Sequence, residues 1–250
     1  MTATALGWIE PDWPAAEHVR VLSTLRGGGV SEGPYASLNL AAHVGDRADA
    51  VAANRMLLRQ AAHLPGEPLW LEQVHGTEVA RHAGTAGKPP RADAAVAFEP
   101  GRVCVVMTAD CLPVVFADRA GTRVAVAHAG WRGLVGGVLQ ATIAALEVPP
   151  ADLHAWLGPA IGPGAFEVGP EVREAYLANL AVPDTDACFV PNDRGRYLAD
   201  LYGLARLVLG AAGVTSIHGG GWCTHEDARR FYSFRREGVT GRMATLAWLA

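Results

Sequence analysis

The chain has 250 residues, of which 50% are hydrophobic and 18% charged, and its formal net charge is −4 at pH 7. This composition is typical of a globular protein and excludes an intrinsically disordered chain. It also excludes the basic surface that nucleic acid or an anionic membrane would need. The first 14 residues lack the cationic and apolar regions of a signal peptide, and no apolar run reaches the roughly 20 residues of a membrane-spanning helix. We therefore expect a cytoplasmic protein with no nucleic acid or membrane partner.

The chain shows no sign of division into parts. It contains no low-complexity tract, internal repeat or convincing linker, so we expect a single domain over residues 1–250 that exists as a monomer or homodimer. Four cysteines are too few for a disulfide scaffold, and reduced thiols are expected: Cys104, Cys111, Cys188 and Cys223.

Helical patterns occupy four segments, taken in chain order: 46–64, 133–146, 170–180 and 197–213. Asp46 is the expected N-cap of the first, and Gly213 the expected C-cap of the last. Seven short segments rich in Val, Leu and Ala predict strands: 67–75, 93–98, 102–110, 112–118, 122–130, 153–160 and 214–220. The strands gather in the middle without a helix between each pair. This order favours an α+β fold with α/β/β/α layers over a doubly wound parallel sheet.

Three polar residues stand at the ends of predicted strands: His75, Cys111 and His128. If these strands are neighbours in one sheet, the three side chains converge at its edge. Two imidazoles and a thiolate suit Zn²⁺ with a fourth position for water or substrate, and the same set could hold copper. Without metal, either histidine could deprotonate Cys111 to give a nucleophile, with Asp110 orienting the histidine. The two mechanisms compete for one sulfur, and both stay open at this stage.

Further polar residues are candidates for binding a substrate. Asn39 and His43 precede the first predicted helix, and Arg132 lies four residues after His128, where it could reach an anion. Arg235 belongs to a cluster of cationic and aromatic residues: Tyr232, Phe234, Arg235, Arg236 and Arg242. The cluster is either a site that binds phosphate and stacks a base, or a basic turn exposed to solvent. Cys223 and His225 could form a second pair of metal ligands. We favour the alternative, in which Cys223 is a structural cysteine in a loop.

Long segments of the chain resemble the laccase-domain family, also labelled polyphenol oxidases or multifunctional purine nucleoside phosphorylases. The resembling segments are 26–46, 70–76, 108–118, 127–133, 155–169 and 229–249. The chain departs from the family before its glycines, where "STLR" replaces the more usual Thr-Thr-Arg, which affects the expected pocket near Arg26. The resemblance implies that His75, Cys111 and His128 are the metal-binding and catalytic trio, usually with zinc. It also implies a layered fold related to cysteine hydrolases of the cytotoxic-necrotizing-factor type.

The activities that the resemblance implies are phosphorolysis of adenosine, inosine, guanosine and methylthioadenosine, together with deamination of adenosine. Phosphorolysis needs an anion site, for which Arg132 and Arg235 are candidates, and contacts to sugar or base, for which Asn39 and His43 are candidates. Deamination needs a metal-activated water and a proton shuttle, for which Asp110 is the candidate. Alternatives are a cysteine hydrolase that edits peptidoglycan precursors and a copper-dependent polyphenol oxidase. Laccase chemistry is not expected, because the nine histidines are scattered and include no His-x-His pair.

Overall fold

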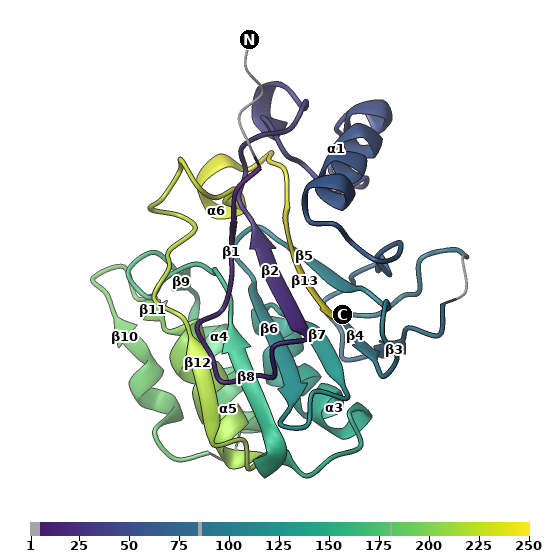
Figure 1. Cartoon of the computed structure of the whole chain (residues 1–250). Helices are drawn as coiled ribbons and strands as arrows, with labels where there is room; N and C mark the ends of the chain where they lie inside the picture. Colours follow the sequence, from purple (N-terminus) through teal and green to yellow (C-terminus); the bar gives the residue numbers. More distant parts are fainter. Residues whose placement is uncertain (1–5, 85–86, 181) are drawn as a thin grey trace.

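Two β-sheets packed face to face form the frame of the protein (Figure 1). The computed structural model describes residues 6–84, 87–180 and 182–250. Its mixture of helices with three sheets confirms the α+β prediction. Within the described ranges, no helix is both long and apolar enough to cross a bilayer.

The first sheet has four antiparallel strands, in the order β1 (Trp8–Ile9), β2 (Val19–Thr24), β13 (Met243–Leu249) and β5 (Cys104–Thr108). The second has six, in the order β12 (Ser216–Gly219), β8 (Leu153–Leu157), β6 (Leu112–Asp118), β7 (Val124–Ala129), β4 (Ala94–Ala97) and β3 (Val79–Arg81). Its outer pairs β12–β8 and β3–β4 are parallel, and its inner pairs are antiparallel. A small third sheet contains β10 (Phe189–Pro191), β11 (Tyr197–Ala199) and β9 (Glu167–Val168).

The described helices are α1 (Ala48–Ala61), α2 (Trp131–Gly136), α3 (Val138–Ala145), α4 (Pro170–Asn179), α5 (Leu201–Ala211) and α6 (Phe234–Glu237). Short 3₁₀ turns lie at Gly33–Tyr35, Pro150–Asp152 and Thr185–Cys188.

Three apolar clusters hold the layers together. Between the sheets, Val106 and Ala247 of the four-stranded sheet meet Val126 of the six-stranded sheet. On the outer face of the six-stranded sheet, strand residues pack against α3 and α5, and on the outer face of the four-stranded sheet they pack against Leu58 of α1. Both faces of β6 and β7 are therefore covered, which explains why these strands have buried side chains throughout.

Six of the seven predicted strand segments contain a strand, but 67–75 does not. That segment makes only isolated bridges, Leu69 with Cys104 and Glu72 with Arg91. The Gln73 side chain takes the place of strand pairing, because its Nε2 donates to the carbonyl of Met107 (2.9 Å) and its Oε1 accepts from the Met107 N–H (2.8 Å).

Two predicted helices also differ from those in the structure. The segment 133–146 is divided into α2 and α3 at Gly137, whose φ of 100° no right-handed helix can contain. The segment 197–213 begins as strand β11, and Asp200 then caps α5 by accepting the Gly203 N–H (2.9 Å). The C-cap of α5 is Ala212 rather than the expected Gly213, which follows it with the left-handed φ of 93° that is usual after a C-cap.

Asp46 is not the N-cap of α1. The N-cap position belongs to Arg47, which makes no side-chain cap bond. The Asp46 carboxylate accepts instead from the Ser31 hydroxyl (2.6 Å) and the Asn39 amide (2.9 Å). These two contacts have thus taken the place of the N-cap bond that the sequence predicts, and the other oxygen of Asp46 accepts the N–H of the adjacent Arg47 (2.8 Å).

Strands β2 and β13 were not predicted from the sequence, yet residues 19–23 of β2 pair with residues 245–249 of β13 in the middle of the four-stranded sheet. One lies near the start of the chain and the other near its end, and both are almost wholly buried. Strands buried on both faces lack the alternating pattern that marks an amphipathic strand.

A pair of alanine substitutions tests the helix break. In Gly137→Ala the new Cβ has room, since its nearest neighbour would be Gln140 Oε1 at 3.7 Å, but φ stays left-handed. We expect a loss of about 1 kcal/mol in the free energy of unfolding. Gly210→Ala in α5 has ordinary φ and open space, and we expect a gain of up to about 1 kcal/mol. Urea unfolding measures both, and changes of the same sign would contradict the backbone argument.

Candidate metal and catalytic site

The structure brings His75, Cys111 and His128 together from three separate segments. Cys111 lies in the turn between β5 and β6, His128 in β7, and His75 in the bend before β3. Their potential ligand atoms all lie within 4.8 Å of one another. In the part of the chain that the structure describes, this is the one group of three or more His, Cys, Asp or Glu side chains that could hold a metal ion.

Asp93, directly before β4, positions both histidines. Its fully buried carboxylate accepts the backbone N–H groups of Val74 (3.1 Å), His75 (2.9 Å) and Gly76 (2.7 Å). It also accepts from Nδ1 of the His128 ring (2.8 Å). The backbone N–H of His128 donates to the backbone carbonyl of Asp93 (2.7 Å). Burial raises the pKa of Asp93, but these hydrogen bonds outweigh it and lower the pKa below its usual value. Asp93 is therefore a charged anchor.

The turn of the chain at His75 follows from this anchor. Three successive N–H groups can point at one carboxylate only if the backbone curls, and His75 accordingly has a left-handed φ of 60°. Because Nδ1 of His128 is engaged by Asp93, Nε2 of that ring is left to bind a ligand. A carboxylate behind a histidine in this way is common at metal sites, where it fixes the ring's orientation.

Cys111 is held from the other side by its neighbour Asp110, which has a left-handed φ of 105°. The two carboxylate oxygens of Asp110 accept from the Thr224 hydroxyl and the Arg235 N–H, both at 2.7 Å. Gly130 faces the sulfur, and a Cβ there would lie 3.0 Å from both Cys111 Sγ and the His75 ring. The site therefore requires glycine at 130.

The trio is electrostatically coupled. Cys111 Sγ lies 3.9 Å from His75 Nε2, and the two imidazole centroids are 4.8 Å apart. Burial raises the pKa of Cys111, but the positive charge of His128 and the bonds to both histidines outweigh it and lower the pKa to about 6. Burial lowers the pKa of His128, but the Cys111 charge and the Asp93 bond outweigh it and raise the pKa to about 9. Without metal, the site is thus a thiolate beside an imidazolium.

A cavity of about 240 Å³ opens above the trio. Besides the trio, seven residues line it: His43, Gln73, Met107, Thr108, Ala109, Phe234 and Arg242. Arg242 lies 5.7 Å from the centroid of the Phe234 ring and, among the described residues, makes no ion pair with a carboxylate. Burial lowers the pKa of Arg242, and burial with Arg242 and Arg55 nearby lowers the pKa of His43, which is neutral at pH 7.

Of the predicted substrate-binding residues, only His43 lines this cavity. Asn39 is fully buried, and its amide bonds to Ala41, Asp46 and the backbone of Arg242. The exposed Arg132 lies over the ring of Trp131, and Arg235 donates to the carbonyl of Glu167. Asp110 also lies outside the cavity lining, with both oxygens engaged, so no contact supports its expected role as a proton shuttle.

The proposed second metal pair, Cys223 and His225, has structural contacts. Cys223 Sγ accepts the Gly162 N–H (3.2 Å), and the carbonyl of His225 accepts from Arg236 (2.7 Å).

The sequence analysis missed one residue of the site, Asp93. The one local indication of its role is that this acid immediately precedes a wholly buried strand. Burying a carboxylate there without hydrogen-bond partners would cost free energy.

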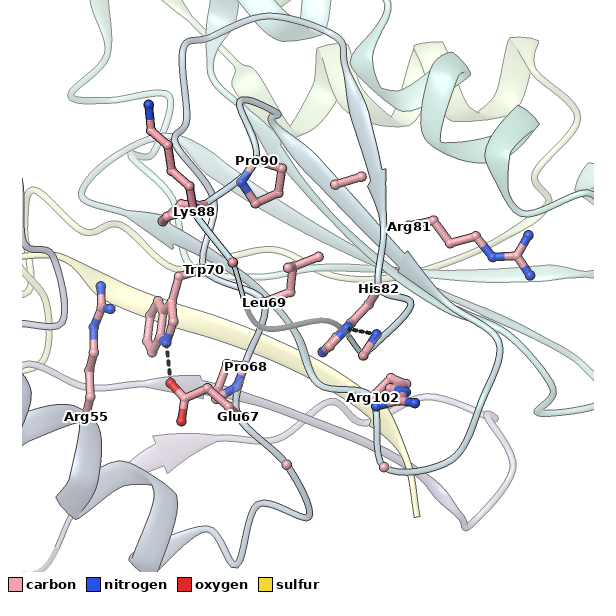
Figure 2. Close-up of a pocket in the computed structure, with 16 residues that line it drawn as sticks. Arg55, Glu67, Pro68, Leu69, Trp70, Arg81, His82, Lys88, Pro90 and Arg102 are labelled. Atoms are coloured by element: carbon pink, nitrogen blue, oxygen red, sulfur yellow. Dashed lines mark hydrogen bonds between the residues drawn. The ribbon is translucent and has the colours of Figure 1, made fainter.

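A larger cavity of about 680 Å³ lies elsewhere, and none of the three residues of the trio lines it (Figure 2). Arg55 stacks on Trp70 at 3.7 Å, and Trp70 Nε1 donates to Glu67 (3.0 Å). Arg102 pairs with Glu99 outside the lining. Arg55, Glu67 and Arg102 are thus already engaged, and the size of this cavity does not make it the reactive site.

The electrostatic coupling predicts how Cys111 reacts in the metal-free protein. Because the thiolate is the reactive form, alkylation by iodoacetamide should have its midpoint near pH 6 rather than at the roughly pH 8.5 of a free thiol. Asp93→Asn removes the charge that favours protonated His128, so the Cys111 midpoint should move upwards. Peptide mass spectrometry measures each cysteine separately, and Cys188, whose pKa burial raises to about 11, is the internal control. A Cys111 midpoint that Asp93→Asn leaves in place would contradict the coupling.

Comparisons with known proteins agree with one another. Residues 20–250 match the family described as multi-copper polyphenol oxidoreductase laccase. A Pseudomonas aeruginosa protein named purine nucleoside phosphorylase is 54% identical, covering 97% of this chain and 98% of its own. Escherichia coli purine nucleoside phosphorylase YfiH is 52% identical, covering 96% and 98%. A Neisseria meningitidis crystal structure matches with a TM-score of 0.93 at 51% identity, covering 97% and 98%. The chain therefore belongs to the multi-copper polyphenol oxidoreductase laccase family.

Proposed function

We propose that this protein is a purine nucleoside phosphorylase whose substrates bind in the cavity above His75, Cys111 and His128. The observation that carries the proposal is the charge of the cavity: its described lining contains the cation Arg242 and no carboxylate. A phosphate ion needs such a cation, and a neighbouring carboxylate would repel it. The names of the Pseudomonas and Escherichia relatives, at more than half identity, support the same activity.

Each wall of the cavity has a role in this proposal. Arg242 binds the attacking phosphate, and Phe234, whose ring is exposed, stacks on the purine. The neutral imidazole of His43 forms a hydrogen bond with the sugar or base. In the reaction the bond between ribose and purine breaks, a bond from ribose to phosphate oxygen forms, and the purine leaves with a proton. Adenosine, inosine, guanosine and methylthioadenosine are the proposed substrates, with deamination of adenosine as a second reaction.

The trio fits a zinc ion. Two imidazoles and a thiol of lowered pKa make a three-residue donor set with one position open, and Asp93 holds the His128 ring in place. Bound there, the metal would supply a Lewis acid next to the substrate. Copper suits the same ligands, but the described residues contain one such cluster, whereas four-electron reduction of oxygen needs several copper centres. We therefore propose zinc rather than laccase chemistry.

A cysteine hydrolase that edits peptidoglycan precursors is the second candidate. One observation favours it: Cys111, His128 and Asp93 form a nucleophile, a base and an orienting carboxylate in series. The proposed kinship with cysteine hydrolases of the cytotoxic-necrotizing-factor type, in a single domain over residues 1–250, points the same way. A metal on the sulfur would suppress this reactivity, so metal content separates the two candidates.

The first experiment measures metal content and adenosine turnover in the same preparation. We expect about one zinc per chain, release of adenine that requires phosphate, and loss of both in Cys111→Ser because one ligand is missing. Cys223→Ala, which removes a cysteine outside the trio, should keep both. Stoichiometric zinc in Cys111→Ser would contradict the ligand set, and a metal-free protein that is inert to nucleosides would favour the hydrolase.

Arginine substitutions test the anion site. Arg242→Gln should raise the KM for phosphate by roughly tenfold or more, because it removes a charge-assisted contact, and should change the KM for nucleoside much less. Arg132→Gln, at the arginine that the sequence predicted, should leave both values near those of the parent protein. A larger rise in the KM for phosphate in Arg132→Gln than in Arg242→Gln would instead indicate that Arg132 binds the anion.

A further inference from the structure

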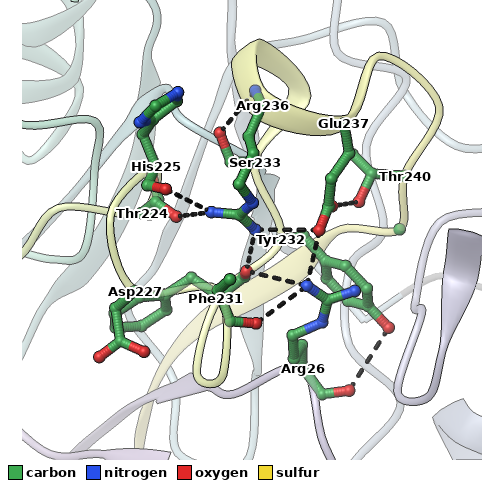
Figure 3. A network of polar contacts seen from close by, with 12 residues as sticks. Arg26, Thr224, His225, Asp227, Phe231, Tyr232, Ser233, Arg236, Glu237 and Thr240 are labelled. Carbon is green, nitrogen blue, oxygen red and sulfur yellow. Dashed lines mark hydrogen bonds and ion pairs between the residues drawn. The ribbon is translucent and has the colours of Figure 1, made fainter. Parts of the chain in front are cut away.

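A carboxylate outside the cavity holds the segment that forms one of its walls. Phe234 begins α6, Glu237 ends it, and Arg242 follows five residues later. Figure 3 shows the polar contacts around Glu237. The Glu237 carboxylate pairs with Arg26 Nη1 (2.7 Å) and Arg236 Nη2 (3.0 Å). The hydroxyl of Thr240, in the loop between α6 and Arg242, donates to its other oxygen.

The two guanidinium groups extend this contact into the surrounding chain. Arg236 donates to the carbonyls of Thr224 (2.6 Å) and His225 (2.7 Å). Arg26, just after β2, donates to the carbonyl of Ala228 (3.0 Å) and lies 4.6 Å from the Tyr232 ring centroid. These contacts join the end of β2 to the loop 224–232 and to α6.

Glu237 is the shared counterion of both arginines, and the side chains of all three are mostly buried. Burial raises the pKa of Glu237, but the bonds from Thr240, Arg26 and Arg236 outweigh it and lower the pKa to about 2. The carboxylate is therefore ionised at any working pH. Removing its charge would leave two mostly buried cations without a carboxylate partner, which is strongly unfavourable.

The metal side of the cavity has its own attachment to the same helix. The carboxylate of Asp110, next to Cys111, accepts the Arg235 N–H in the first turn of α6. This bond does not involve Glu237. Loss of Glu237 should therefore loosen α6 and the loop to Arg242 while the trio keeps its geometry.

We propose that Glu237 is a positioning residue that holds Phe234 and Arg242 over the metal trio and so sets substrate affinity. The proposal rests on the proposed function in taking the cavity as the substrate site. Glu237 itself is not part of the cavity lining.

The test uses the metal-loaded protein with Glu237→Gln, which keeps the shape and removes the charge. We expect the KM values for phosphate and nucleoside to rise by roughly tenfold or more, with kcat changed by less than about threefold and full metal content. Glu237→Asp, which keeps the charge, should restore part of the affinity. Thr240→Val removes only one contact, so it should fold even if Glu237→Gln does not, and should raise both KM values to a smaller extent.

Two variants separate positioning from stability. Glu147→Gln removes a charge from an exposed pair with Arg123 (3.2 Å), and Val208→Ala lowers stability from within α5. Both should leave the KM values unchanged. If Glu237→Gln lowers the melting temperature as Val208→Ala does but leaves KM unchanged, its role is only structural and the proposal fails. Loss of metal in Glu237→Gln would overturn it as well.

Hydrogen exchange gives a readout that does not depend on activity. Glu237→Gln should speed amide exchange across residues 234–242 and leave the segments around His75 and His128 unchanged. Unchanged exchange across 234–242 overturns the positioning role even if the protein is an active phosphorylase. Faster exchange in a protein without phosphorolysis would refute the proposed function and leave Glu237 as the residue that orders this wall.

Discussion

The buried carboxylate of Asp93 is the constraint on which the site depends. A carboxylate removed from water costs several kcal/mol unless donors surround it. Here the donors are three successive N–H groups of residues 74–76 and the ring of His128. Because they come from a loop and a strand far apart in the sequence, satisfying one carboxylate places His75 and His128 side by side. The left-handed backbone at His75 is the strain that this arrangement requires.

A second carboxylate orders the opposite wall. Glu237 holds α6 and the loop to Arg242 through two arginines, as Asp93 holds the histidines. Neither carboxylate lines the cavity, whose described lining contains the guanidinium of Arg242 and no carboxylate. These two carboxylates thus hold the surrounding chain in place and lie outside the cavity in which an anion would bind. Asp110 links the two halves, since it lies beside Cys111 and binds the first turn of α6.

The same three side chains support metal binding and nucleophilic chemistry for one physical reason. Positive charge near the sulfur favours the thiolate, and a thiolate is both the better ligand and the better nucleophile. Asp93 serves either role, by orienting His128 and by keeping it protonated when no metal is present. What decides between the candidates is therefore occupancy of the site by metal and the substrates that fit the cavity.

The sequence by itself determined the α+β class and six of the strand segments, because apolar runs that end in polar residues are local signals. It also predicted that His75, Cys111 and His128 converge if their strands are neighbours. The three side chains do converge, although residues 67–75 form no strand. Only the tertiary structure decided which polar residues surround the trio. Asn39, Arg132 and Arg235 have the right chemistry, yet their partners lie in other segments, and β2 with β13 became a central pair only through contact between distant parts of the chain. Asp93 was missed for the same reason. The value of a buried charge depends on donors that approach it in space, and their approach is not written in its neighbours along the chain.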